Sequence, residues 1–242
     1  MILQLKKLHP EDMIIMLVSS NLFKKSSKSR KVRCEICANY CKIADGSYGI
    51  CKQHKNINGE LFDESFGVVS SLNADPIEKK PLYHFLPGTL TYSVGGFGCN
   101  MGCLHCQNYM ISQEFDKISD RFNILPETIV ENAINQGCKS IAWTYNEPTI
   151  HLPFNKKTSL LAKRKNLKII YVSNGYMSDQ SLSEILNFVD VFNIDLKSMS
   201  QNFYKKICKA DLNIVLNNLK RIYDADKHLE ITNLLINGYN DS

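Results

Sequence analysis

Five apolar segments of strand length alternate with helical segments in the second half of the chain, and this alternation limits the fold more than any other feature. The strand-like segments cover residues 90–94, 139–144, 167–172, 190–195 and 229–236. The pattern predicts helices over 125–134, over about 154–165, after 179 and over 200–224. Such alternation predicts βα units around a parallel sheet, either an open doubly wound sheet or a βα barrel.

Polar residues directly follow four of these strands. Cys99 follows the first strand, Asn146 and Glu147 the second, Ser173 and Asn174 the third, and Asp195 and Lys197 the fourth. The carboxyl ends of parallel strands meet at one edge of the sheet, and ligands bind at that edge in both candidate folds. We therefore expect these side chains to converge on one site.

Three cysteines lie close together after the first strand, as Cys99, Cys103 and Cys106 in a C-x3-C-x2-C spacing. Three thiolates can hold one face of a metal cluster, but they leave one ligand position open. A [4Fe–4S] cluster usually takes four cysteines, and catalytic metal sites keep an open position. The spacing therefore indicates chemistry at a fourth iron, and a zinc loop with a distant fourth ligand is the alternative.

A second group of cysteines, Cys34, Cys37, Cys41 and Cys51, has the spacing C-x2-C-x3-C-x9-C. Four thiols suffice for a closed zinc site or an auxiliary iron–sulfur cluster, and thiols alone do not decide between these metals. Tight grouping of cysteines is typical of metal ligands rather than of a disulfide framework. The two isolated cysteines, Cys138 and Cys208, are interpreted as small buried residues.

Charge and hydropathy restrict the partners of the chain. The net charge of +5 comes largely from the basic stretch between Lys24 and Arg33, which is interpreted as a solvated linker rather than a nucleic-acid surface. The apolar residues 13–18 are too few to cross a bilayer, so a cytoplasmic protein without membrane contact is expected. The predicted organisation is a leader or linker over 1–30, a cysteine-rich metal-binding segment over 31–85, and a core over 86–242.

The cysteine loop after a strand resembles the cluster loop of radical S-adenosylmethionine (SAM) enzymes. Residues 144–148 resemble the Gly-Gly-Glu-Pro turn of that superfamily, with Asn146 in place of a glycine. Residues 173–175 are similar to its ribose-contacting turn, and 195–197 to a strand-end motif of its activating enzymes. The resemblance implies a [4Fe–4S] cluster on the three loop cysteines. It also implies SAM contacts from Asn146, Glu147, Ser173, Asn174, Asp195 and Lys197.

Residues 34–242 resemble the AmmeMemoRadiSam-system radical SAM proteins, relatives of the pyruvate formate-lyase activating enzyme, notably over 73–87 and 230–241. This resemblance implies a partial (βα)6 barrel and reductive cleavage of SAM to a 5′-deoxyadenosyl radical. It further implies an electron donor of the flavodoxin or ferredoxin type, and a protein substrate that loses a glycine hydrogen atom. Radical chemistry on a small molecule or side chain, or a non-catalytic metal-binding module, are the alternatives.

The sequence stops soon after the fifth predicted strand, whereas the family resembled here is generally longer. We expect a barrel that is truncated after this strand and exposes unpaired backbone groups at its edge. Lower stability and impaired catalysis are the expected consequences.

Overall fold

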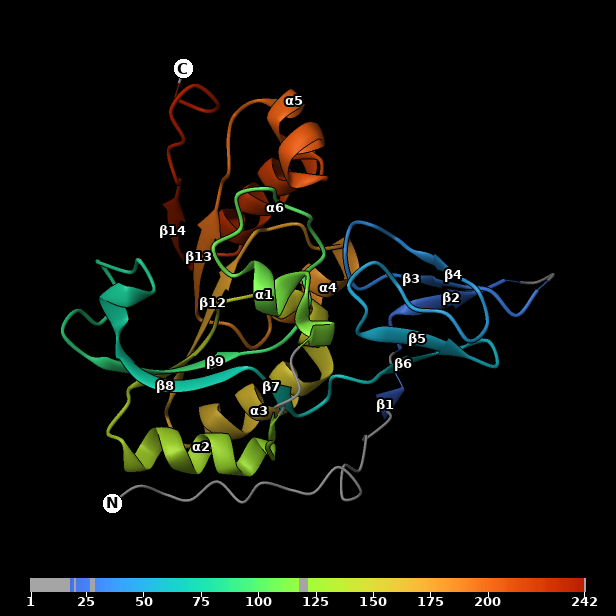
Figure 1. The fold of residues 1–242 in the computed structure, drawn as a ribbon. Coiled ribbons are helices and arrows are strands. Elements are labelled where there is room, and N and C mark those ends of the chain that lie inside the picture. The colour runs from blue at the N-terminus through green and yellow to red at the C-terminus, as the bar shows by residue number, and fades with distance from the viewer. Residues whose placement is uncertain (1–17, 20, 27–28, 118–121, 242) are drawn as a thin grey trace.

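A single six-stranded sheet forms the centre of the computed structural model, which describes residues 18–19, 21–26, 29–117 and 122–241. Its strand order is β14-β13-β12-β11-β9-β8 (Figure 1). The five strands β9 and β11–β14 are parallel, and β8 pairs antiparallel with β9. The bounds are β8 Ser71–Pro76, β9 Leu90–Gly95, β11 Ser140–Trp143, β12 Lys168–Ser173, β13 Val191–Asp195 and β14 His228–Thr232. This partial barrel confirms the predicted fold class.

The helices connect successive parallel strands and cover the outer face of the sheet (Figure 1). They are α1 Tyr109–Ser112, α2 Pro126–Asn135, α3 Leu152–Arg164, α4 Asp179–Ile185, α5 Gln201–Phe203 and α6 Leu212–Asp224. Single turns of other helix types are η2 Ile77–Lys79, η3 Phe115–Lys117, η4 Pro148–His151 and η5 Tyr204–Cys208. Proline at the start of α2 suits a helix N-terminus, since the first N–H groups have no helical partner.

The predicted helix over 200–224 is interrupted in the structure. It divides into α5, the π-helical turn η5 and α6. Lys209 ends η5 with φ +59°, a left-handed conformation that stops a helix, and Asp211 then caps α6 by accepting from the N–H of Asn213. The fifth predicted strand is also shorter than expected, because β14 ends at Thr232.

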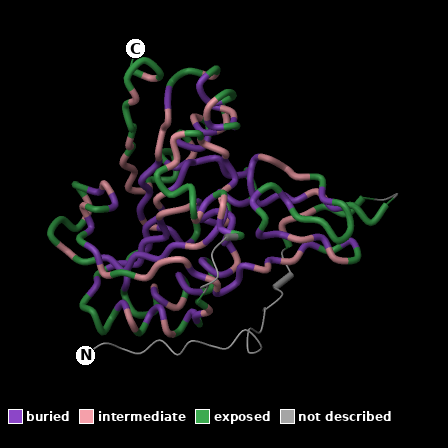
Figure 2. Tube along the Cα trace, viewed as in Figure 1, coloured by how far each residue is buried: buried purple, intermediate pink, exposed green. Residues whose placement is uncertain are grey.

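Both faces of the sheet are covered, as a parallel sheet requires. On the outer face, the helices and the strands share one large apolar core. On the inner face, Ile77 and Leu82 pack against Ala142, Ile170 and Val191, which close the lower part of the barrel. The buried residues accordingly run through the middle of the molecule in Figure 2. The segment that follows β8 therefore forms the floor of the barrel.

The N-terminal part forms small antiparallel sheets beside the barrel, at the right in Figure 1. One contains β1 Val18–Ser19, β6 Glu60–Asp63 and β5 His54–Ile57, and another contains β2 Phe23–Lys25, β3 Val32–Cys34 and β4 Lys42–Ile43. The third pairs β7 Val68–Val69 with β10 Phe122–Asn123. Part of the predicted leader thus contributes β1 and β2, and β8 of the predicted cysteine-rich segment belongs to the main sheet. Most of the apolar residues 13–18 lie outside the described residues.

Several basic residues near the N-terminus form ion pairs with acidic side chains. Arg33 and Lys24 both contact Glu35, and Lys25 contacts Glu60. These ion pairs lie on the β2–β3 hairpin. Within the described part of the chain, no helix is long and apolar enough to cross a membrane.

Candidate active site

The loop from Cys99 to Cys106 follows β9 at the carboxyl edge of the sheet. Gly98 precedes it with φ +81°, and a Cβ at this position would lie 2.5 Å from the Cys51 carbonyl oxygen, so a glycine is required. Within the loop, the N–H of Met101 donates to the Cys99 sulfur at 3.4 Å. The backbone therefore already offers Cys99 the hydrogen bond that stabilises a thiolate.

The turn η5 lies against the cysteine loop. The N–H of Gly102 donates to the Cys208 carbonyl at 3.0 Å, and the N–H of Leu104 donates to the Ile207 carbonyl at 3.1 Å. These two bonds bracket Cys103 and satisfy backbone donors that the loop itself leaves unpaired. The loop is consequently held by residues about one hundred positions further along the chain.

Cys208 has a role that the sequence did not indicate. It is buried, as expected, but its thiol hydrogen-bonds the sulfur of Cys103. This bond lowers the pKa of the Cys103 thiol, and the charge of Lys197 acts in the same direction against the effect of burial. The interpretation of Cys208 as only a small buried residue is therefore incomplete, since the interpretation rested on its isolation in sequence.

The ends of the first and third strands meet at Asn174. Its amide nitrogen donates to the side-chain oxygen of Asn100 at 2.8 Å and lies 3.7 Å from the Cys99 sulfur. Asn100 in turn donates to the carbonyl of Tyr176 at 2.8 Å. The turn after β12 is thereby fastened to the cysteine loop, so the predicted neighbours Cys99 and Asn174 do lie together.

Glu147, at the end of the second strand, is buried against the same turn. Its carboxylate accepts from the N–H groups of Thr149 and Asn174, and from the hydroxyls of Thr149 and Ser173. Burial raises the pKa of Glu147, and these hydrogen bonds oppose that effect. The carboxylate thus links the ends of β11 and β12, and its contact with SAM stays a prediction.

The fourth strand end supplies an ion pair near Cys103. The ammonium group of Lys197 lies 2.7 Å from the Asp195 carboxylate. Both charges act on the thiol of Cys103, one lowering and one raising its pKa. All four predicted strand ends therefore surround the cysteine loop, and the individual contacts of Ser173, Asp195 and Lys197 with SAM remain predictions.

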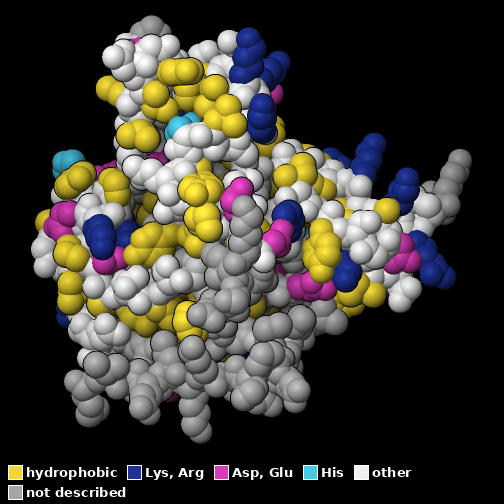
Figure 3. All heavy atoms as spheres, in the orientation of Figure 1, with side chains coloured by type: hydrophobic (Ala, Val, Ile, Leu, Met, Phe, Trp, Pro, Cys, Tyr) yellow, Lys and Arg dark blue, Asp and Glu magenta, His cyan; other side chains and the backbone are white. Residues whose placement is uncertain are grey.

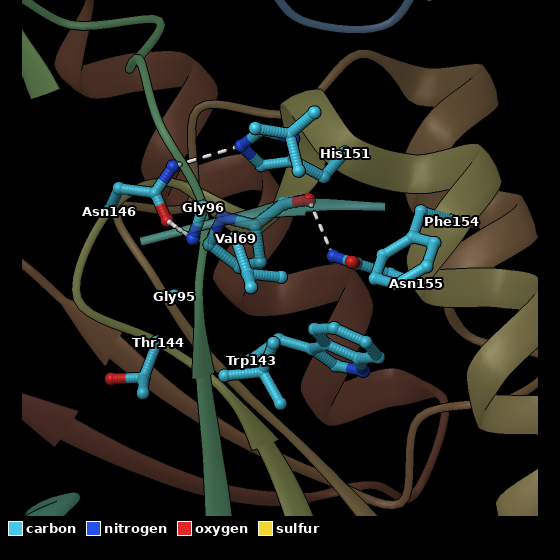
Figure 4. A pocket seen from close by; sticks show the side chains of 12 residues that line it. Val69, Gly95, Gly96, Trp143, Thr144, Asn146, His151, Phe154 and Asn155 are labelled. Atoms are coloured by element: carbon cyan, nitrogen blue, oxygen red, sulfur yellow. Dashed lines mark hydrogen bonds between the residues drawn. The ribbon is translucent and has the colours of Figure 1, made fainter. Parts of the chain in front are cut away.

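Asn146 supports the entrance to the cysteine loop (Figure 4). Its side-chain oxygen accepts from the N–H of Gly96 at 2.9 Å, and its amide nitrogen donates to the Gly98 carbonyl at 2.9 Å. One side chain therefore satisfies two backbone groups of the segment that leads to Cys99. A glycine at position 146 would lack both bonds. This contact accounts for the departure from the Gly-Gly-Glu-Pro pattern.

A buried hydrogen-bonded chain holds Asn146 in place. The Nε2 atom of His151 lies 3.0 Å from the Asn146 amide nitrogen (Figure 4). The Nδ1 atom of His151 lies 2.9 Å from the Ser65 hydroxyl. Ser65 donates to Asp63. Burial lowers the pKa of His151 to about 4, so the ring is neutral near pH 7. A neutral ring that accepts at Nε2 and donates at Nδ1 satisfies both Asn146 and Ser65.

We expect His151→Leu to lower the free energy of unfolding by about 1–3 kcal/mol, because Asn146 and Ser65 each lose a buried hydrogen bond. The same variant is expected to retain less iron after reconstitution, since the entrance to the cysteine loop loses its support. Chemical denaturation and iron analysis measure the two effects. His84→Leu, which changes a largely exposed histidine, is the control. Unchanged stability in His151→Leu would show that the hydrogen bonds of His151 do not stabilise the fold.

The four N-terminal cysteines form a group beside the barrel. The thiols of Cys34, Cys37 and Cys51 each accept a hydrogen bond from the N–H two residues further on. Burial raises the pKa of Cys34 to about 12 and of Cys51 to about 11, and the neighbouring thiols, Cys41 among them, add to both shifts. Removing the thiol protons in such a site requires a compensating positive charge, which a metal ion provides.

Neither cysteine group is arranged around a single point. Among the described residues, no three His, Cys, Asp or Glu side chains are placed to hold one metal ion. For the N-terminal cysteines the bound metal, zinc or an auxiliary cluster, remains a prediction.

The N-terminal cysteine segment contacts the barrel beside the cysteine loop. Cys37 forms a bridge with Met177 in the turn after β12. The side chain of Asn39 donates to the Asn100 carbonyl at 2.6 Å, and Ser181 donates to the carbonyl of Ile36 at 2.6 Å. Asn100, which follows Cys99, therefore connects the N-terminal cysteine segment with the cysteine loop.

A buried ion pair lies under the second strand end. Lys80 is 2% exposed and contacts the Asp75 carboxylate at 2.9 Å. Tyr145 donates to the same carboxylate at 2.8 Å, and its ring lies 4.4 Å from the Lys80 ammonium group. Burial would raise the pKa of Asp75, but hydrogen bonds from Lys80, Lys79 and Tyr145 hold it well below its usual value. Tyr145 itself has φ +72°, so this cluster stabilises a strained turn directly before Asn146.

The sequence of this chain is similar to that of known proteins. A family model described as the radical SAM superfamily matches residues 93–242. Two curated relatives come from Methanocaldococcus jannaschii. The uncharacterized protein MJ0808 is 43% identical over 222 residues, which are 91% of this chain and 66% of the relative. The uncharacterized protein MJ0674 is 29% identical over 149 residues, 57% of this chain and 44% of the relative. The chain thus spans less than two thirds of either relative.

Similar solved structures include the following two. A structure of TYW1 with a lysine-pyruvate adduct has a TM-score of 0.49 and 18% identity, and the match covers 73% of this chain and 68% of that one. A domain of pyruvate-formate lyase-activating enzyme from Bacteroides vulgatus has a TM-score of 0.40 and 21% identity. That match covers 43% of this chain and 64% of the domain.

Proposed function

The chain belongs to the radical SAM superfamily, and we propose that it is an enzyme that cleaves SAM reductively to start a radical reaction. One observation carries the proposal. The C-x3-C-x2-C loop lies at the carboxyl edge of a partial barrel, and polar groups from the three following strand ends surround it. A closed structural site would need a fourth protein ligand, from the loop or from elsewhere, whereas an open iron suits such polar neighbours.

The residues around the loop suit this role. In our proposal Cys99, Cys103 and Cys106 hold a [4Fe–4S] cluster. The hydrogen bond from Met101 to the Cys99 sulfur and the thiol of Cys208 beside Cys103 stabilise thiolate ligands. When bound, the cluster and SAM supply reductive cleavage of a carbon–sulfur bond, with methionine and a 5′-deoxyadenosyl radical as products.

The protein's own contribution is orientation. Asn146 and Asn174 fix the loop from two sides, and Glu147 joins the turns on which both residues lie. The Asp195–Lys197 pair offers one charge of each sign at the fourth strand end. We propose that these strand-end groups, with Ser173, receive the amino, carboxylate and ribose groups of SAM.

The substrate class in our proposal is a protein partner, as in activating enzymes, from which a glycine α-hydrogen atom is removed. The support for it is the sequence resemblance over 73–87 and 195–197. Electron paramagnetic resonance after mixing the reduced enzyme, SAM and a candidate partner tests it, because a glycyl radical has a characteristic α-proton splitting. Consumption of SAM with a small molecule alone, and no signal on any protein, would contradict this part of the proposal.

Anaerobic reconstitution with iron and sulfide tests the proposed activity. We expect a brown protein that converts SAM to 5′-deoxyadenosine and methionine when dithionite is added, and no conversion when dithionite is omitted. Liquid chromatography quantifies both products. A colourless zinc protein without SAM cleavage would instead identify a metal-binding module.

A further inference from the structure

The cysteine loop reaches the molecular surface on the side that faces away from the barrel interior. Leu104, between Cys103 and Cys106, is 72% exposed, and both cysteines are partly exposed. Cys99, which is also partly exposed, lies beside Asn174. The loop is thus reachable from the molecular surface at Leu104.

Three lysines adjoin this exposed side. Lys205 and Lys206 lie on η5 and Lys209 ends it, and all three are exposed. The stem of Lys209 covers Gly102, since a Cβ on that glycine would lie 3.3 Å from the lysine Cγ. Figure 3 shows basic side chains at the top centre, where Figure 1 labels α5. The three lysines and Leu104 are called the basic face below.

The charges of the basic face are uncompensated. Among the residues that the structure describes, no carboxylate lies within ion-pair distance of Lys205, Lys206 or Lys209. The nearest acidic residue in sequence, Asp211, is engaged in capping α6. The N-terminal lysines, by comparison, are paired with Glu35 and Glu60. A positive surface without partners attracts an acidic protein and accelerates encounter.

The turn that carries the lysines is rigidly joined to the cysteine loop. Besides the two backbone bonds to Gly102 and Leu104, the ring of His105 lies 5.7 Å from that of Phe203 in α5. A protein that docks on the lysines is therefore placed beside the cluster ligands. Electron-transfer encounters use small and transient interfaces, so a short segment such as η5 with Leu104 offers an area of the right order.

We infer that the basic face is the docking surface of the electron donor, an acidic one-electron carrier protein with a flavin or iron–sulfur group. The inference rests on the proposed function, which requires one electron for each SAM cleaved. The donor docks on the lysines, gives one electron to the cluster behind Leu104, and is itself oxidised by one electron. No covalent bond forms or breaks in this step.

The test compares two triple variants of the reconstituted protein. Lys205→Gln/Lys206→Gln/Lys209→Gln removes the basic face. Lys139→Gln/Lys165→Gln/Lys168→Gln removes the same charge from the amino ends of β11 and β12, at the opposite edge of the sheet. Stopped-flow absorbance follows cluster reduction by a purified acidic flavodoxin in its hydroquinone form. We expect about a tenfold lower second-order rate constant and a weaker salt dependence for the first variant, and less than a twofold change for the second.

Reduction by dithionite separates this inference from the proposed function. Both variants should cleave SAM with dithionite at the wild-type rate, because glutamine keeps the Cβ and Cγ atoms with which Lys209 covers Gly102, and none of the six lysines lies at the carboxyl end of a strand. If wild-type protein fails to cleave SAM with dithionite, the proposed function fails, while flavodoxin-driven cluster reduction still reports on docking. Equal rate losses in both variants, or none in either, would overturn the inference. So would self-association or RNA binding that only the first variant abolishes, since the basic face would then serve another partner.

Discussion

Replacement of Cys99, Cys103 or Cys106 by alanine is expected to reduce 5′-deoxyadenosine formation to the level measured without protein. Each cysteine supplies one of only three thiolates in the loop, and two thiolates do not retain the cluster. Iron analysis should show a loss of about four iron atoms per chain. Iron at the N-terminal cysteines, if that site holds a cluster, should remain, so the same measurement reports on the second site.

Cys138→Ala is the matched control for these variants. Cys138 is buried outside both cysteine groups, so its replacement should leave iron content and SAM cleavage unchanged. Cys208→Ala gives a further comparison, because it leaves all three ligands in place and removes only the thiol beside Cys103. Full 5′-deoxyadenosine formation in any single loop variant would refute the assignment of the ligands.

Replacement of Lys80 by alanine is expected to lower the free energy of unfolding by about 3 kcal/mol, since it removes the buried cation of the Asp75 carboxylate and leaves only the exposed Lys79 as an ion-pair partner. For a chain of this length the melting temperature should fall by about 10 °C. Tyr145 also loses its contact with the ammonium group, so the turn before Asn146 should loosen. Thermal denaturation followed by circular dichroism measures the effect.

Lys79→Ala provides the control for Lys80→Ala. Lys79 contacts the same carboxylate at 2.9 Å, but its side chain is 64% exposed, so its loss should cost less than about 1 kcal/mol. The pH dependence gives a second check. The pKa of Asp75 is depressed, so the pair contributes fully above its usual value of 3.8, and this contribution is lost as the pH falls below that value. If Lys80→Ala and Lys79→Ala lowered the free energy of unfolding equally, the buried Lys80–Asp75 pair would not have the larger stabilising effect proposed here.

The local pattern of apolar and polar residues was sufficient to predict the parallel strands and the edge at which the site lies. The five parallel strands and the convergence of Cys99, Glu147, Asn174 and Asp195 at one edge were predicted, because strand periodicity and strand order determine which ends meet. The predictions that were wrong or incomplete concern places where the chain departs from a regular period. The π-helical turn η5 and the left-handed Lys209 interrupt a segment whose composition is helical throughout.

The roles of several polar residues depended on partners far away in sequence. The contact of Asn146 with SAM stays a prediction, and the structure adds the bonds of its side chain to Gly96 and Gly98, which the sequence did not indicate. His151 carried no signal, since its partner Ser65 belongs to the N-terminal segment.

The sequence by itself predicted the five parallel strands and the position of the cysteine loop, because these follow from short-range periodicity and from thiol spacing, and its resemblance to radical SAM enzymes indicated the family. Only the tertiary structure decided what supports the loop and which side of it is open. The bonds from Asn146, the thiol of Cys208 and the placement of Lys209 beside Gly102 join residues that are distant in sequence. Such pairs have no period along the chain, so they become visible only when folding brings them within hydrogen-bond distance.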